Sequence, residues 1–251
     1  MQSISFQNKG GGKGEITIYS EIGDSFWSDS YSAKQFAEDL KKLGDVTSLD
    51  IRINSPGGSV FDGFAFYNLL KQHKAEKTVY IDGMAASIAS VISMVGDKII
   101  MAEASHMMIH DPYGGCMGTS ADMRKTAELL DTLKGTIAGV YASRTGRPMD
   151  VFTEAMASET WYTAQEALNA GLCTEISKNQ AVAACFDPQK FGFKNMPKDL
   201  HVEINIEIDD DKEEEMEAAE EATETAQNAI PAKLLAAKRR QEVARAISEG
   251  R

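Results

Sequence analysis

The sequence predicts an α/β fold in which successive βαβ units build a mostly parallel sheet and one long helix follows them. Short stretches of alternating apolar residues, typical of strands, take turns with stretches in which apolar residues recur at helical spacing. Glycine- and proline-containing turns separate the two kinds of segment. Strand and helix in this rhythm favour right-handed βαβ units around a parallel sheet.

The first half of the core supplies three strand–helix pairs. Strands with alternating apolar residues are expected at 15–22, 49–53 and 79–81. Segments with helical spacing follow them, at 33–43, 61–70 and 85–95. Ser32 is a plausible N-cap for the first helix and Gly44 a plausible stop. Gly83 is expected to let the chain turn tightly out of the third strand.

The second half of the core is expected to be dominated by one helix. Two short strands, 98–101 and 106–109, precede an amphipathic segment from Ser120 to Thr145, which ends at the Gly146-Arg147-Pro148 turn. Two shorter helices are expected after it, at 150–158 and 163–170. Because no repeat or linker interrupts this pattern, residues 15–178 are predicted to form one domain.

The two ends differ in composition from this core. Residues 1–14 are polar and end in a glycine run, which predicts a flexible arm. The segment 179–251 is first irregular, then acidic, then a short basic amphipathic helix at 233–247. Residues 203–224 carry twelve acidic residues and one lysine, a balance of −11 in a total of −12. Such a stretch favours disorder, with a docking or scaffold-like arm as the alternative.

Composition excludes several classes of function. The negative net charge argues against a general nucleic-acid binder, which needs a basic face. Cys116, Cys173 and Cys185 form no CxxC pair and have no histidine at ligand spacing, so neither a disulfide scaffold nor a metal site is expected. No signal peptide or membrane span is expected, and no P-loop or other cofactor motif occurs. A cytoplasmic protein without a cofactor is the expectation.

Three short motifs carry residues that suit nucleophilic catalysis. Ser87, in GMAAS, is expected at a strand-to-helix turn, where unpaired amides favour developing negative charge. The turn NSPGG, which ends at Gly58, exposes backbone amides that suit an anion. His110, in MMIHDP, is expected at the end of a strand, where it can serve as a base. Each motif alone has a plainer explanation: a capping serine, an ordinary β-turn and a structural histidine.

Taken together and in this order, the motifs resemble the ClpP family of serine peptidases. The likeness extends from about residue 16 to 176 and includes SRTGRPMD and ETWYTAQEALNAGL. It implies a ClpP/crotonase-like spiral with a long handle helix, Ser87 as nucleophile and His110 as general base. It also implies an oxyanion hole built from the amides of Gly58 and Ile88. Homo-oligomeric rings that admit unfolded chains, and an ATP-driven unfoldase as partner, are further properties of the family.

The third member of the expected triad has no obvious counterpart. Counting from the flanking motifs places Ala155 where the family has its aspartate. The nearest carboxylates are Asp150, Glu154 and Glu159, and Glu159 is preferred as the group that orients His110. A Ser–His dyad without a carboxylate is the alternative, because orientation is only part of what a triad contributes.

Within the family, the chain looks most similar to ClpP-related head maturation proteases of tailed phages and prophages. The early GDSFW segment, SETWYTAQEAL and the charged tail carry this similarity. It implies capsid and scaffold proteins as substrates, in the host cytoplasm or the prohead. The alternatives are a housekeeping Clp-type subunit, a degenerate ClpP-like scaffold protein, and a crotonase-type acyl-CoA enzyme that shares the spiral architecture.

Overall fold

A computed structural model describes residues 4–23, 31–178 and 192–197, all of which belong to one compact unit, Met1–His201. The acidic stretch, the basic helix expected at 233–247 and Cys185 lie outside the described residues. No helix among the described residues is long and apolar enough to cross a membrane.

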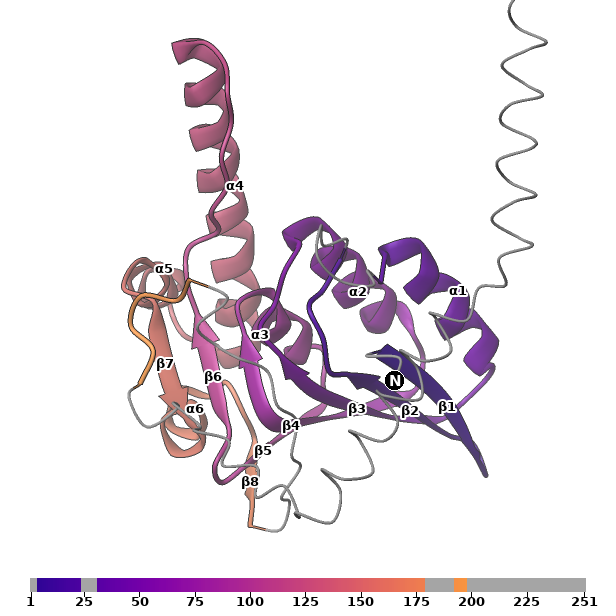
Figure 1. Cartoon of the computed structure of the whole chain (residues 1–251). Coiled ribbons are helices and arrows are strands. Elements are labelled where there is room, and N and C mark those ends of the chain that lie inside the picture. Colours follow the sequence, from indigo (N-terminus) through magenta and orange to yellow (C-terminus); the bar gives the residue numbers. More distant parts are fainter. Residues whose placement is uncertain (1–3, 24–30, 179–191, 198–251) are drawn as a thin grey trace, which may run out of the picture. The chain divides into compact units, whose positions relative to one another are not determined.

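The described residues form one eight-stranded sheet and six helices (Figure 1). The strands are β1 (Ile4–Gly10), β2 (Lys13–Ile18), β3 (Ser48–Ser55), β4 (Glu76–Ala86), β5 (Lys98–Ala102), β6 (His106–Ile109), β7 (Thr160–Thr163) and β8 (Glu175–Ser177). The helices are α1 (Ala33–Leu43), α2 (Val60–Gln72), α3 (Ile88–Ser93), α4 (Ser120–Thr145), α5 (Met149–Ala157) and α6 (Ala164–Ala170).

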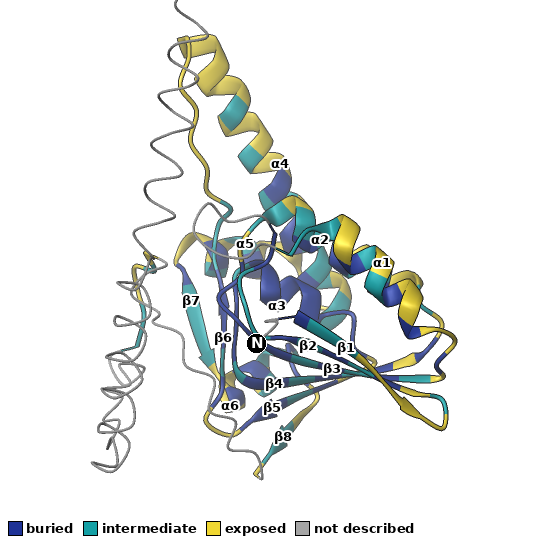
Figure 2. Cartoon of the chain, turned by 45° about the vertical axis from the view of Figure 1, so that its right-hand side comes forward, coloured by how far each residue is buried: buried dark blue, intermediate teal, exposed yellow. Residues whose placement is uncertain are grey.

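The centre of the sheet is parallel, which confirms the predicted α/β fold. Its main path runs β1-β2-β3-β4-β5-β8, and every pair from β2 onward on that path is parallel. Among the strands of the described residues, the pairs β1–β2 and β6–β7 alone are antiparallel. The helices α1 and α2 lie side by side over this sheet (Figures 1 and 2).

Strand β4 forks the sheet, and this fork positions the candidate site. Its first part, Thr78–Ile81, pairs with β5, whereas its last part, Met84–Ala86, pairs with β6. Both pairings are parallel, so the carboxyl ends of β4 and β6 lie next to each other. The residues that follow these two strands are Ser87 and His110.

The core lies between the sheet and its helices. Phe36 of α1 stacks on Phe66 of α2 with ring centroids 4.0 Å apart, and both rings are fully buried. All six residues of α3 are buried, whereas the outer half of α4 is exposed (Figure 2). Burial on every side explains why four of its residues are apolar and why its two serines, Ser90 and Ser93, bond their hydroxyls to carbonyls one turn earlier.

The N-terminal segment differs from its prediction. Residues 1–14 were expected as a flexible arm, but the structure places β1 and the start of β2 there, as an antiparallel hairpin. Gly10, Gly11 and Gly12 all have positive φ and form its turn. Ile4 is buried and the ring of Phe6 packs edge-on against Phe36. This strand has only two apolar residues, Ile4 and Phe6, and its other residues are polar or glycine. So short an apolar alternation was not enough to predict a strand.

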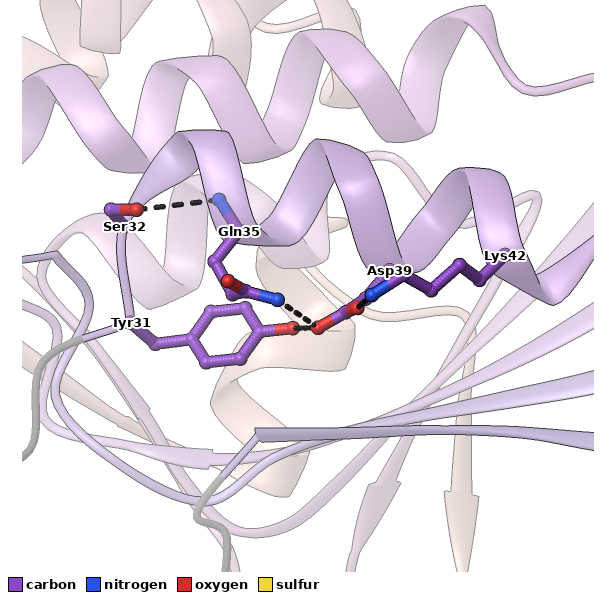
Figure 3. A network of polar contacts seen from close by, with 5 residues as sticks. All are labelled: Tyr31, Ser32, Gln35, Asp39 and Lys42. Carbon is purple, nitrogen blue, oxygen red and sulfur yellow. Dashed lines mark hydrogen bonds and ion pairs between the residues drawn. The ribbon is translucent and has the colours of Figure 1, made fainter.

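The predicted helix ends are mostly confirmed. Ser32 caps α1, as expected, and Tyr31 beside it donates to Asp39 in the second turn of the helix (Figure 3). Hydrogen bonds from Gln35, Lys42 and Tyr31 lower the pKa of Asp39 to about 2. This network ties the chain that enters α1 to the helix itself.

Two local predictions were wrong around the nucleophile turn. The helix expected at 85–95 is only Ile88–Ser93, because Ala85 and Ala86 extend β4. Gly83 therefore lies inside the strand and does not turn the chain. It is needed for close approach: a Cβ there would lie 2.8 Å from Oδ1 of Asn54, which accepts the amide of Met84 at 2.9 Å. The strands β7 and β8 were not predicted.

Candidate active site

Ser87 makes the turn between β4 and α3 itself. Its φ of 55° and ψ of −129° are unusual for a residue with a side chain. The turn is fixed on both sides: the Ser87 amide donates to the Met108 carbonyl at 2.9 Å, and the Ser87 carbonyl accepts from the amide and hydroxyl of Ser90. A strained serine held between a strand and a helix projects its Oγ outward, as in a nucleophile elbow.

His110 meets Ser87 as the sequence predicted. Its Nε2 lies 2.8 Å from Oγ of Ser87, which is hydrogen-bond distance. Burial lowers the pKa of His110, while the charges of Glu159 and Asp111 partly oppose this and that of Lys194 adds to it. A lowered pKa keeps the imidazole neutral near pH 7, so that Nε2 can accept the proton of the Ser87 hydroxyl.

The glycine turn lies against Ser87. Ile22 donates to the Gly57 carbonyl at 2.8 Å and accepts from the Ser59 amide at 2.7 Å, so the Gly58 amide points the other way. In the described part of the chain it has no hydrogen-bond partner, nor has the amide of Ile88, the first of α3. Both amides predicted for an oxyanion hole are therefore available.

Gly57 is a site residue that the sequence analysis did not single out. A Cβ on Gly57 would lie 2.6 Å from Cβ of Ser87 and 3.2 Å from the Ile88 amide nitrogen, and its φ is 97°. No other residue type fits there without displacing the turn. Gly57 thus lets the glycine turn approach the serine closely enough for both amides to face one space.

Glu159 is near His110 but is engaged elsewhere. It is buried, with φ of 45°, and its charge raises the pKa of His110. Its Oε1 accepts from the amides of Lys194 and Asn195, both at 2.7 Å, and from Nε1 of Trp161 at 3.3 Å. Among the described residues no hydrogen bond joins Glu159 to His110, and Nδ1 of His110 has no partner.

The other carboxylates considered for this place lie on the exposed side of α5. Asp150 accepts from the amide of Val151 at the start of the helix, and Glu154 is exposed. Ala155 packs against the core.

Asp111, directly after the histidine, forms an ion pair with Lys134 of α4 at 2.9 Å. Its Oδ1 is buried and has no hydrogen-bond partner among the described residues.

Two neighbours of the site carried no signal in the sequence. Phe193 lies in a segment that was predicted only as irregular, yet its ring lies edge-on to His110, with centroids 6.2 Å apart. Tyr141, fully buried on α4, contacts the Ser90 hydroxyl at 2.8 Å, and Ser90 in turn bonds the Ser87 carbonyl. Periodicity placed Tyr141 on the buried face of its helix but could not place its hydroxyl.

Comparison with known proteins gives a consistent result. Residues 12–180 match the model of a family described as Clp protease. An ATP-dependent Clp protease proteolytic subunit of Bacteroides fragilis is 33% identical over 153 residues, which cover 59% of this chain and 74% of that protein. The protein of the same name from Porphyromonas gingivalis is 31% identical over 153 residues, or 59% of this chain and 69% of that one.

A third relative, ATP-dependent Clp protease proteolytic subunit 2 of Chlamydia pneumoniae, is 34% identical over 142 residues, covering 56% of this chain and 68% of its own. The family match spans the glycine turn, Ser87, His110 and Glu159. The chain belongs to the Clp protease family.

Proposed function

We propose that the protein is a serine endopeptidase with Ser87 as nucleophile and His110 as general base. The observation that carries this proposal is the 2.8 Å contact between Nε2 of His110 and Oγ of Ser87, at a strained turn. As Oγ attacks a peptide carbonyl, its proton passes to Nε2. The imidazolium then gives that proton to the leaving amine, and an acyl-enzyme remains on Ser87. Water activated by His110 hydrolyses the ester.

The amides of Gly58 and Ile88 serve this reaction as the oxyanion hole. Negative charge develops on the carbonyl oxygen when the tetrahedral intermediate forms, and preorganised amides stabilise it. Gly57 lets the glycine turn pack directly against Ser87 and the Ile88 amide. Because the amides are fixed by the Ile22 pairing and by α3, they need no reorganisation as the charge appears.

Glu159 acts as the carboxylate that favours the imidazolium. Its charge raises the pKa of His110, and so does that of Asp111. Either one stabilises the protonated base midway through the reaction, when the positive charge is greatest. The peptidase domain that we propose at 15–178 holds all of these groups, with the hairpin strand β1 added to it.

The biological role that we propose is processing of phage capsid or scaffold proteins by homo-oligomeric rings. Its support is the acidic segment 203–224 and the sequence similarity already noted. The exposed outer half of α4, which bears Met123 and Leu129 on its surface, suits a helix that interdigitates between rings. A housekeeping subunit fed by an ATP-driven unfoldase is the second candidate, since the relatives are named as proteolytic subunits of an ATP-dependent protease.

One experiment tests mechanism and role together. One portion of the purified protein and of its Ser87→Ala variant is treated with a fluorophosphonate, and a second, untreated portion of each is incubated with phage capsid and scaffold proteins. The proposal expects label on Ser87 and discrete cleavage by the unsubstituted protein alone. Equal cleavage by the alanine variant would overturn the mechanism. Labelling without capsid cleavage, but with casein degradation when an unfoldase is added, would favour the housekeeping role.

A further inference from the structure

Six residues near the end of the described chain, Gly192–Pro197, lie against the site and are called the strap here. Two strap amides, those of Lys194 and Asn195, donate to Oε1 of Glu159 at 2.7 Å. The side-chain amide of Asn195 also donates to the carbonyl of Ser158 at 2.7 Å. The strap is thus fastened to a carboxylate whose charge acts on His110 and to the residue before it.

The strap also places one aromatic ring beside the catalytic pair. Phe193 packs edge-on to Trp161, with centroids 5.3 Å apart, and lies edge-on to His110. Phe193 and Trp161 pack against a small apolar cluster separate from the main core, made of Met84, Ala86 and Met108. Ala86 precedes Ser87 directly, so the ring covers apolar surface next to the nucleophile.

Glu159 has two uses that compete. A histidine base works best when a carboxylate accepts from its Nδ1–H and holds the tautomer that leaves Nε2 free. In this structure the described residues offer Nδ1 of His110 no partner, while three donors converge on one oxygen of Glu159. A carboxylate that binds two strap amides is held in place and cannot rotate freely toward His110.

We propose that the strap is an intramolecular brake: fastened, it holds Glu159 away from His110 and covers the apolar cluster with Phe193; released, it frees Glu159 to bond Nδ1 of His110. This inference rests on the proposed function of Ser87 and His110. The strap is suited to release, because Gly192, Lys194 and Asn195 are exposed. Toward the other described residues the strap makes three hydrogen bonds through Lys194 and Asn195, and exposed backbone of this kind opens locally at lower cost than a paired core strand.

Substitutions in the full-length protein separate the brake from a purely structural role. Asn195→Pro removes one of the two strap amides that donate to Glu159, whereas Asn195→Ala keeps both and serves as the matched control. Phe193→Ala keeps every strap amide and removes the ring. It tests the brake in case the proline variant does not fold. The measurements are the rate of fluorophosphonate labelling at Ser87 and turnover of a small peptide ester, both across pH.

We expect Asn195→Pro and Phe193→Ala to raise the labelling rate roughly tenfold, a fraction of the ~10⁴ that an orienting carboxylate can contribute in a complete triad. Asn195→Ala is expected to have a smaller effect than Asn195→Pro. Adding Glu159→Gln should abolish the gain, because only the freed carboxylate produces it. The acid limb of the released variants should also move to higher pH, since a closer Glu159 favours the imidazolium.

Three results would count against the brake. Unchanged or slower labelling in both variants would mean that the strap supports the site, and the proposal would be lost. An equal gain with and without Glu159→Gln would overturn the role of the carboxylate. Absence of labelling in the folded starting protein and in all variants would instead refute Ser87 as nucleophile, a failure distinct from that of the brake.

Discussion

The two sides of the candidate site are built in different ways. The nucleophile side consists of Ser87, His110 and the glycine turn, and each follows directly after a strand of the central sheet. The carboxylate side consists of Glu159, at the end of α5, and the strap, 33 or more residues later in the chain. The first side is fixed by strand register, the second by contacts between segments outside the parallel sheet.

This difference separates what is rigid from what can change. Moving Ser87 relative to His110 would require breaking the β4–β6 pairing, which sits within the buried core. Releasing Glu159 requires that two part-buried strap amides exchange one acceptor for water and that the Phe193 ring leaves its neighbours, while the parallel sheet stays intact. The chemistry therefore resides on the rigid side, and any adjustment of its rate resides on the carboxylate side.

The largest effect is expected from replacing the nucleophile Ser87, on the rigid side of the site. Ser87→Ala should lower peptidase activity by roughly 10⁴-fold or more, because no acyl-enzyme can form. Ring assembly should be unchanged, as measured by analytical ultracentrifugation. The matched variant Ser87→Gly should be equally inactive. Its free energy of unfolding should exceed that of Ser87→Ala by about 1 kcal/mol, because glycine adopts a φ of 55° without strain. Equal melting temperatures for the two variants would argue against strain at this turn.

The next effect concerns the glycine turn. Gly57→Ala should cost about 10²–10³-fold in kcat, the loss typical of one oxyanion donor, because the new Cβ pushes the turn away from Ser87. The control is Gly135→Ala on α4, where a Cβ meets nothing within 4 Å. That change should leave activity intact and raise the free energy of unfolding slightly, by about 0.5–1 kcal/mol. Retained activity in Gly57→Ala would refute the oxyanion assignment.

What the sequence could predict follows the same division. The apolar alternation predicted strands β3 to β6 and therefore the residues that follow them. Together with the order of the motifs, this was enough to predict that Ser87 and His110 lie close together. The hydrogen-bond partners of Glu159 were not, because Lys194 and Asn195 lie in a stretch with no periodicity. Backbone amides carry no side-chain signature, so a carboxylate that binds them looks unpartnered in a sequence.

The third effect tests the carboxylate side through pH. Activity needs neutral His110, and burial lowers its pKa, so activity should persist below about pH 6.5 and fall as pH drops through the lowered value. Glu159→Gln removes a charge that raises this pKa, so the acid limb should move to lower pH while kcat falls no more than about tenfold. Asp111, paired with Lys134, and Lys194 also act on His110 and are unchanged.

Glu154→Gln is the matched control for that variant. Glu154 is exposed on α5 and does not contribute to the pKa of His110, so its pH profile should coincide with that of the unsubstituted protein. An unchanged pH profile in Glu159→Gln, or a larger loss of activity in Glu154→Gln, would assign the role of the triad carboxylate to another group.

The smallest expected effect lies where α4 meets the nucleophile turn. The Tyr141 hydroxyl contacts Ser90, whose own hydroxyl donates to the Ser87 carbonyl at 2.5 Å, so the helix supports the strained turn through two hydrogen bonds. Tyr141→Phe removes the first bond and keeps the ring against Phe152. The free energy of unfolding should fall by about 1 kcal/mol, and kcat should fall less than in Glu159→Gln, since the second bond remains. Chemical denaturation and ester turnover measure the two quantities. A loss of kcat as large as that in Gly57→Ala would mean that α4 holds the nucleophile turn in place. The strand register of the central sheet would then not be enough to fix the nucleophile side.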